Sequence, residues 1–346
     1  MENLSEWSKR AYQILDSRFS SISNMGIVFP PSPDGIASSV ILSEIASQKG
    51  IYADMAVAVP ENFMEVVEYY AGRCDSLVFI DIPPHGSGLI QAAGELFREV
   101  IIIDHGSTYV YNQGNIARLG IDKAGISTSL LVYLLAVEFN EENDMLSWIA
   151  ASGFYGKCHS KPCLETYERA KLSWPELSED LSLREIQEVL VAASFLGEDW
   201  IYLAASALQE SFDDPSWFLS GNSATASLLR SKVNDVKEEI RNVLDEPFLM
   251  RDSFGAWESP EPYQRIVLAL ISKKEIVKCA LSFFYDPPLG LIYIATREDM
   301  DLGHVVRREL EGLEFSLFGG KDFASIIIDS DYLERTIRSL SKVLSR

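Results

Sequence analysis

The sequence predicts an α/β protein with a parallel-sheet domain, a helical connector and a smaller C-terminal α/β domain. Short apolar strands alternate with helices over residues 1–182, strand patterns are absent over 183–250, and the alternation returns over 251–346. Apolar strands that alternate with helices indicate a parallel sheet covered on both faces. The last segment is long enough to form a domain of its own.

The first domain is predicted to begin with an amphipathic helix within residues 1–15. Four strands follow, each a short apolar run, at 26–30, 51–60, 76–84 and 99–106. The helices of this domain are predicted from apolar residues at helical spacing. They cover 35–48, 61–72, 88–97, 124–139 and 145–156.

The connector shows only helical periodicity, so it is predicted to hold no strand. Its helices cover 183–196, 200–211 and 223–244. The last domain returns to short apolar runs separated by turns, which indicate strands next to helices. Its strands are predicted at 276–285, 289–296 and 323–329, and its helices at 302–310 and 330–345.

The chain carries a formal net charge of −21, from 51 acidic and 30 basic residues. Contacts from lysine and arginine to phosphate supply most non-specific affinity for nucleic acid, so this charge argues against a general DNA-binding protein. No apolar run reaches the roughly 18 residues of a membrane helix, and the N-terminus is unlike a secretory signal, so a cytoplasmic protein is expected. Four cysteines in so long a chain do not indicate a disulfide framework.

Acidic residues follow three of the apolar strands of the first domain. They are Asp34, Asp81 and Asp104, and His105 comes directly after the last of them. Ligands of open parallel sheets bind outside the carboxyl ends of the strands, so we expect these side chains to face one crevice. Carboxylates with an imidazole suit Mn or a similar divalent ion that activates water at a phosphate. The simpler alternative is that each Asp caps the following helix or turn.

The order of several short motifs resembles the DHH phosphoesterases, and within them the RecJ-like branch. "PPSPDGIASSVIL" resembles the first motif, His-x-Asp-x-Asp-Gly, "VFIDIPP" the second, and "IIIDHG" the Asp-His-His motif that names the family. "GISTSLLVYLL" resembles the helix after it, and "WIAASGFYGKC" the fourth motif. "LFGGKDFASIIID" resembles the Gly-Gly-His signature of the DHH-associated domain. The resemblance spans almost the whole chain and implies a DHH-like domain followed by a DHH-associated domain.

Members of the family hold two metal ions, and this chain departs from their ligand pattern. Pro30 and Ser32 stand where the first motif has its His and its first Asp. Gly106 replaces the second His of the third motif, and residues 156–158 (Gly, Lys and Cys) occupy the region of the fourth-motif Asp. A proline side chain cannot coordinate a metal, and serine is a poor substitute for a carboxylate. The resemblance therefore implies that two-metal catalysis is lost, because that mechanism needs both ions.

The resemblance leaves one remnant site, formed by Asp34, Asp81 and His105, with Asp104 as part of the remnant motif. No cofactor is expected, and a single Mn or Mg ion at this remnant is the alternative. A further hypothesis is that the ammonium group of Lys157 replaces a lost cation beside the clustered acids.

In the C-terminal signature, Phe318 replaces a Gly and Lys321 replaces the His that contacts substrate in the family. Gly319, Gly320 and Lys321 are thus weak candidates for substrate binding.

Loss of the ligands favours a catalytically inactive RecJ-like scaffold. Such a chain resembles the archaeal counterpart of the eukaryotic replicative-helicase cofactor, and the resemblance implies that it binds the GINS complex and the MCM helicase in DNA replication. Binding to single-stranded DNA is expected to be weak or absent. Two alternatives stay open: a divergent Mn-dependent phosphoesterase or single-strand exonuclease, and a module that binds a nucleotide or a single-stranded end without cutting it.

Three other segments offer weaker candidate sites. Cys158, His159 and Cys163 lie close together in "CHSKPC", loosely like a zinc cluster, although a structural zinc site needs four ligands and a polar loop is favoured. His85 follows Asp81 in a turn. The aromatic-rich stretch 282–294 would mark a protein interface if its Phe and Tyr residues were exposed, and core packing is the default interpretation.

Overall fold

The computed structural model describes most of the chain, and the residues that it describes fall in sixteen segments. These are 4–59, 62–82, 87–105, 110–121, 125–155, 158, 160–177, 180–220, 222–245, 249–251, 254–258, 281–286, 291–296, 302–313, 315–319 and 323–344. The chain divides into two compact units, Met1–Arg230 and Ser231–Arg346, and each is described by itself.

The first unit contains a six-stranded sheet in the order β2-β1-β3-β4-β6-β5. The strands are β1 (Asn24–Phe29), β2 (Tyr52–Val57), β3 (Ser76–Ile80), β4 (Glu99–Asp104), β5 (Val110–Gln113) and β6 (Ile116–Gly120). Five of the six are parallel, and β5 pairs antiparallel with β6. Strands β1, β3 and β4 are buried almost throughout, as expected for a parallel sheet covered on both faces.

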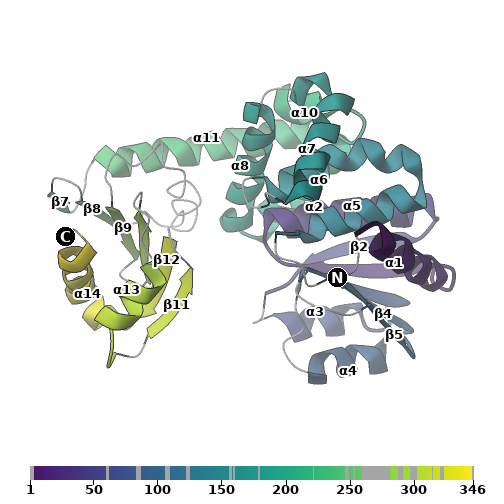
Figure 1. The fold of residues 1–346 in the computed structure, drawn as a ribbon, viewed down its shortest axis with the longest axis horizontal. Helices are drawn as coiled ribbons and strands as arrows, with labels where there is room; N and C mark the ends of the chain where they lie inside the picture. The colour runs from purple at the N-terminus through teal and green to yellow at the C-terminus, as the bar shows by residue number, and fades with distance from the viewer. Residues whose placement is uncertain are drawn as a thin grey trace. The chain divides into compact units, whose positions relative to one another are not determined.

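Helices cover both faces of this sheet, with α3 and α4 on one face and α2 and α5 on the other (Figure 1). The helices of the first unit are α1 (Leu4–Phe19), α2 (Pro33–Gln48), α3 (Phe63–Tyr70), α4 (Ser87–Leu96), α5 (Thr128–Phe139), α6 (Ser147–Phe154), α7 (Lys161–Ser173), α8 (Asp180–Leu196), α9 (Glu198–Glu210) and α10 (Pro215–Ser220). Helix α11 (Ala224–Asp245) begins in the first unit and ends in the second.

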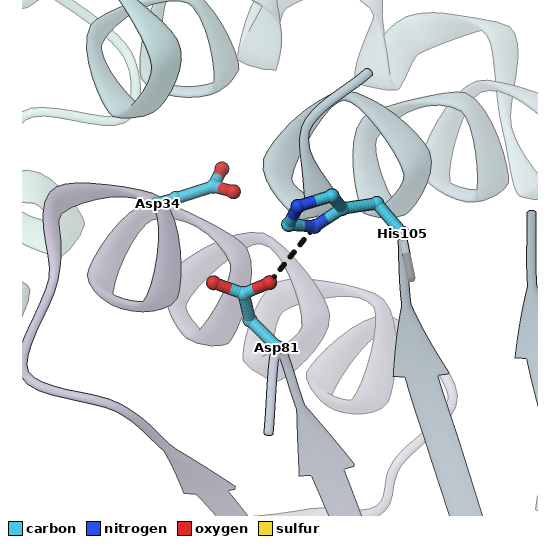
Figure 2. Close-up of side chains that lie close together, drawn as sticks. All are labelled: Asp34, Asp81 and His105. Carbon is cyan, nitrogen blue, oxygen red and sulfur yellow. Dashed lines mark ion pairs between the residues drawn. The ribbon is translucent and has the colours of Figure 1, made fainter. Parts of the chain in front are cut away.

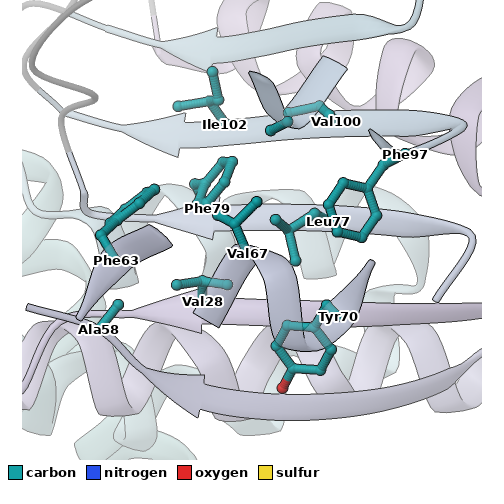
Figure 3. Packing of buried hydrophobic residues seen from close by; sticks show 11 residues of the cluster. Val28, Ala58, Phe63, Val67, Tyr70, Leu77, Phe79, Phe97, Val100 and Ile102 are labelled. Carbon is teal, nitrogen blue, oxygen red and sulfur yellow. The ribbon is translucent and has the colours of Figure 1, made fainter. Parts of the chain in front are cut away.

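One apolar cluster fills the space between the sheet and α3 (Figure 3). Phe63, Val67 and Tyr70 of α3 pack against alternate residues of the central strands, among them Leu77 and Phe79. A Cβ atom added to Gly26 would lie 2.8 Å from the ring of Tyr70. The glycine in β1 thus allows the ring of Tyr70 to approach the strand closely.

The second unit contains a six-stranded, largely antiparallel sheet in the order β11-β12-β10-β9-β8-β7, in which only the β8–β9 pairing is parallel. Its elements are β7 (Leu249–Arg251), β8 (Phe254–Glu258), β9 (Leu281–Asp286), β10 (Leu291–Thr296), α13 (Leu302–Glu309), β11 (Phe315–Gly319), β12 (Phe323–Ile328) and α14 (Ser330–Leu344). Ile292 and Ile294 share one face of β10 and pack with Val306 of α13 and Leu340 of α14.

The α/β fold class is confirmed, and each helix and strand predicted from the sequence has a counterpart here. The structure adds elements that the sequence did not predict: the hairpin β5–β6, helices α7 and α10, and strands β7, β8 and β11. Strand β7 begins at Leu249, within the connector that was predicted to hold no strand. The three-part domain division stays a prediction; the division into two compact units falls between Arg230 and Ser231. Across the described helices, none combines the length and apolar character that crossing a membrane requires.

Cys158 and Cys163 form a disulfide with a Cα–Cα distance of 6.1 Å. Both residues are buried, and Cys163 lies in the first turn of α7. This corrects the expectation of a polar loop, because 161–163 is helical. It also argues against the zinc cluster that was the less favoured alternative, because disulfide-bonded sulfurs cannot serve as thiolate ligands. The link closes a short segment, so it is a local tie and not a framework.

Candidate metal site

Asp34 lies in the first turn of α2 and is almost fully buried. The helix begins here because Ser32 is its N-cap, with Oγ accepting a hydrogen bond from the backbone N–H of Gly35 at 3.0 Å, and Pro33 follows. A Cβ atom on residue 35 would lie 2.5 Å from the carbonyl oxygen of Pro30, so this tight turn requires glycine. The turn directs the Asp34 carboxylate toward α5.

The carboxylate of Asp34 accepts two backbone hydrogen bonds at the N-terminus of α5. Thr128 N–H donates to Oδ2 at 3.0 Å, and Ser129 N–H donates to Oδ1 at 2.9 Å. These N–H groups have no partner within the helix, and the helix dipole favours a negative charge at this end. Asp34 therefore ties α2 to α5.

Asp81 follows the last residue of β3 and has a φ of 52°. This left-handed conformation is uncommon outside glycine, although aspartate tolerates it better than most residues. Its Oδ1 accepts a hydrogen bond from the Thr128 hydroxyl at 2.7 Å. The same oxygen lies 3.0 Å from Nδ1 of His105, which follows β4.

Asp34, Asp81 and His105 come together at the carboxyl ends of the strands (Figure 2). One potential ligand atom from each lies within 4.8 Å of those of the other two. Because β3 and β4 are parallel neighbours, the residues that follow them meet at the same edge of the sheet. The structure thus places these three residues together, as the sequence predicted.

Burial, reinforced by the nearby charge of Asp81, raises the pKa of Asp34, although its hydrogen bonds to Ser129 and Thr128 act in the opposite direction. The pKa of His105 is also raised, chiefly by its hydrogen bond to Asp81, and this outweighs the effect of burial. The cluster therefore favours bound positive charge, either a proton on the imidazole or a cation.

Among the residues that the structure describes, the donor set fits one divalent ion and not two. Two carboxylates and an imidazole suit Mn or a similar divalent ion, and both carboxylates retain lone pairs beyond their present hydrogen bonds. A second ion would need ligands at the positions of Pro30 and Ser32, and the Ser32 hydroxyl already serves as a helix cap. No two-metal step is therefore assigned to this chain.

Asp104 takes no part in the cluster, which corrects the expectation that three strand-end acids face one crevice. Its side chain is 3% exposed and accepts hydrogen bonds from Arg118 of β6, at 2.6 Å from Nη2 and 3.1 Å from Nε. The neighbouring strand thus neutralises this acid as an ion pair.

Several other predicted positions are not tested by the structure. Those outside the described residues are His85, Gly106, Gly156, Lys157, His159, Gly320 and Lys321. Gly319 ends β11 in the second unit. The side chains of the aromatic-rich stretch are also outside the described set, apart from Ile292 and Ile294.

Sequence reasoning missed Thr128, Ser129 and Arg118. The run Ser127-Thr128-Ser129 before an apolar helix is a helix-start signal, and Ser127 is indeed the N-cap of α5, with Oγ accepting from Leu130 N–H at 3.2 Å. That signal could have located the helix N-terminus. It could not have shown which acid the terminus binds.

Comparisons with known proteins place the fold. No protein-family model matches the chain, and no curated protein matches it. Among solved structures, RecJ from Thermus thermophilus in complex with Mn²⁺ has a TM-score of 0.71 at 15% identity, over 99% of this chain and 55% of that one. The DHH domain of a protein described as a member of a ribosomal-protein family has a TM-score of 0.69 at 12% identity, over 99% and 92% of the two chains.

CDC45 from Entamoeba histolytica has a TM-score of 0.53 at 11% identity, and the match covers 99% of both chains. At these identities the likeness establishes the fold and nothing finer. The chain has the DHH fold of the RecJ-like proteins, as its motif order predicted, and it spans about half the length of the Thermus RecJ.

Proposed function

We propose that this chain, which has the fold that RecJ and CDC45 share, is a catalytically inactive scaffold in DNA replication. The observation that carries the proposal is the donor set of the former catalytic edge. It suits one ion, while Pro30 and the capping Ser32 stand where further ligands belong. A two-metal phosphoester cleavage clamps the attacking and the leaving oxygens, and the described part of the chain offers ligands for only one ion.

The match to CDC45 is consistent with the same proposal, because the alignment covers 99% of both chains. We infer that the partners are those implied by the motif resemblance, the GINS complex and the MCM helicase. The net charge of −21 is consistent with protein partners more than with nucleic acid.

A pull-down with the full chain tests the proposal. The purified protein is mixed with GINS and with MCM from the same organism, and complexes are separated by size-exclusion chromatography. We expect a stoichiometric complex with GINS that Asp81→Ala does not disrupt. Absence of a complex, together with Mn-dependent phosphodiesterase turnover abolished by Asp81→Ala, would overturn it.

The cluster in Figure 2 favours one alternative, a divergent one-metal phosphoesterase or exonuclease. Asp34, Asp81 and His105 would hold the ion, which would supply Lewis-acid activation of water at a phosphate. Single-stranded DNA with a 5′ or 3′ label, incubated with Mn²⁺, separates these functions. Cleavage supports the enzyme, retention without cleavage supports a binding module, and neither result is expected of the scaffold.

A further inference from the structure

Thr128, the first residue of α5, contacts all three members of the cluster. Its backbone N–H donates to Asp34 Oδ2 at 3.0 Å. Its hydroxyl donates to Asp81 Oδ1 at 2.7 Å and lies 3.0 Å from His105 Nδ1. The residue is fully buried, so this hydroxyl belongs to the site and not to the solvent-exposed surface.

These atoms are joined by hydrogen bonds, and their spacing is also compatible with that of ligands around a small divalent ion. Mg²⁺ binds octahedrally with bonds of roughly 2.1 Å, which places adjacent ligand atoms about 3.0 Å apart. Thr128 Oγ1, Asp81 Oδ1 and His105 Nδ1 form a triangle with sides of 2.7, 3.0 and 3.0 Å. The triangle therefore matches one face of such an octahedron.

Charge balance agrees with a neutral fourth ligand. Two carboxylates already compensate a divalent ion, and a third in this buried place would leave an uncompensated negative charge. A hydroxyl adds an oxygen ligand without adding charge, as the Ser or Thr of phosphate-binding loops does for Mg²⁺.

The backbone holds this hydroxyl in place before any ion binds. Thr128 follows the N-cap Ser127, and its own N–H and that of Ser129 are both bonded to Asp34. A β-branched side chain at such a position has few accessible rotamers. Little conformational entropy therefore remains to be lost when the oxygen coordinates.

We propose that Thr128 supplies a hydroxyl ligand to a single divalent-cation site, of the Mg²⁺ or Mn²⁺ class, completed by Asp34, Asp81 and His105. The hydroxyl adds an uncharged oxygen ligand to the two carboxylates and the imidazole. The inference concerns cation affinity only, so it does not depend on partner binding. Loss of the cation in a Thr128 variant leaves the GINS result unchanged, and failure of the GINS complex leaves the cation result unchanged.

The test is titration of the chelator-treated full chain with Mn²⁺, with free ion followed by electron paramagnetic resonance. We expect saturable binding of one ion, at least about tenfold weaker in Thr128→Val and close to native in Thr128→Ser. Thr166→Val is the matched control, because Thr166 is a buried helical threonine whose hydroxyl bonds only the carbonyl of Pro162 among the contacts described, at 3.0 Å. It should bind Mn²⁺ as the native chain does.

Thr128→Cys keeps the test decisive where the valine variant unfolds. A thiolate ligand favours soft ions, so the ratio of Cd²⁺ to Mn²⁺ affinity should rise by about tenfold or more in Thr128→Cys and not in Thr166→Cys. Native-like Mn²⁺ affinity in Thr128→Val would overturn the proposal and leave the hydroxyl as a hydrogen-bond donor only. An unchanged ratio of Cd²⁺ to Mn²⁺ affinity in Thr128→Cys would also overturn the proposal. The absence of saturable Mn²⁺ binding by the native chain would do the same.

Discussion

The backbone N–H of Thr128 donates to the carboxylate of Asp34 at 3.0 Å, so the start of one helix binds an acid from the start of another. Ser129 N–H occupies the second carboxylate oxygen at 2.9 Å. A residue that the motif order marks as a metal ligand thus also has a structural task that needs no ion. The contact between Thr128 and Asp34 is compatible with two roles for Asp34, that of a helix cap and that of a metal ligand. Substitutions can distinguish these roles.

Asp34→Ala is expected to lower the free energy of unfolding by about 2 kcal/mol. Two charge-assisted hydrogen bonds to the α5 terminus are lost, and the relief of burying a carboxylate beside Asp81 offsets part of the loss. Urea unfolding in the presence of a chelator measures the change. Asp214→Ala, which removes a single cap bond to Ser216 N–H, should cost less than half as much. An equal loss of unfolding free energy in the two variants would contradict a contribution from both hydrogen bonds to Asp34.

Stability should fall as pH rises above about 6.5, through His105. Its pKa in the folded state is raised by the hydrogen bond to Asp81, so the folded protein holds the proton to higher pH than the unfolded chain. The contribution is complete below the unfolded pKa and disappears as pH passes the folded pKa. The pKa of Asp34 is also raised, so protonation of Asp34 likewise makes stability fall as pH rises. This second decline lies at lower pH than that of His105, above the ordinary carboxyl range.

Unfolding in urea at several pH values between about 6 and 9, which bracket the ordinary histidine range, measures this slope. His105→Gln removes the titrating group, and Asp81→Asn removes the charge that raises its pKa. Both variants should flatten the decline over this interval. If stability declined as steeply with pH in His105→Gln as in the native protein, the decline would belong to another titrating group.

Gly153→Ala should destabilise the first unit although alanine is the better helix former. An added Cβ atom would lie 2.8 Å from Cβ of Ala37 on α2 and 2.8 Å from Oγ of Ser129 on α5. Overpacking costs roughly 1–3 kcal/mol, which exceeds the gain of about 1 kcal/mol in helix propensity. Gly94→Ala in α4 is the matched control, because its nearest neighbour is the flexible end of Ile116 at 3.1 Å. Thermal unfolding should show a lower midpoint for the first variant alone.

The sequence predicts the order of elements because each predicted strand is an apolar run and each predicted helix has apolar residues at helical spacing. It also brings Asp34, Asp81 and His105 together, since residues that follow parallel strands share one edge. It could not assign Asp104 correctly, because the partner Arg118 lies on β6, a strand with a charged residue at its centre and no alternating pattern. It could not place Thr128 either. A helix-start signal names the terminus, but only the packing of α5 against α2 decides which carboxylate it meets.

Arg118→Leu should destabilise the protein by roughly 2–3 kcal/mol, because it leaves a buried charge with fewer partners. That charge is Asp104, whose side chain is 3% exposed. Arg169→Leu is the comparison, since Arg169 and Asp144 form a more exposed pair, 51% and 36% exposed, which is worth below about 1 kcal/mol. The two variants are compared by urea unfolding. Similar losses of stability in the two variants would mean that Arg118 does little to stabilise the buried charge of Asp104.

The Cys158–Cys163 disulfide predicts the thiol count of the isolated protein. Of the four cysteines, only Cys74 and Cys279 should react with a thiol reagent in denaturant without reductant, and all four after reduction. A link across five residues removes little chain entropy, so Cys158→Ser with Cys163→Ser should cost about 2 kcal/mol at most. Four reactive thiols before reduction would show that the pair is reduced in the isolated protein. In that case a reductant should leave the thermal midpoint unchanged, whereas with the bond present the midpoint should fall.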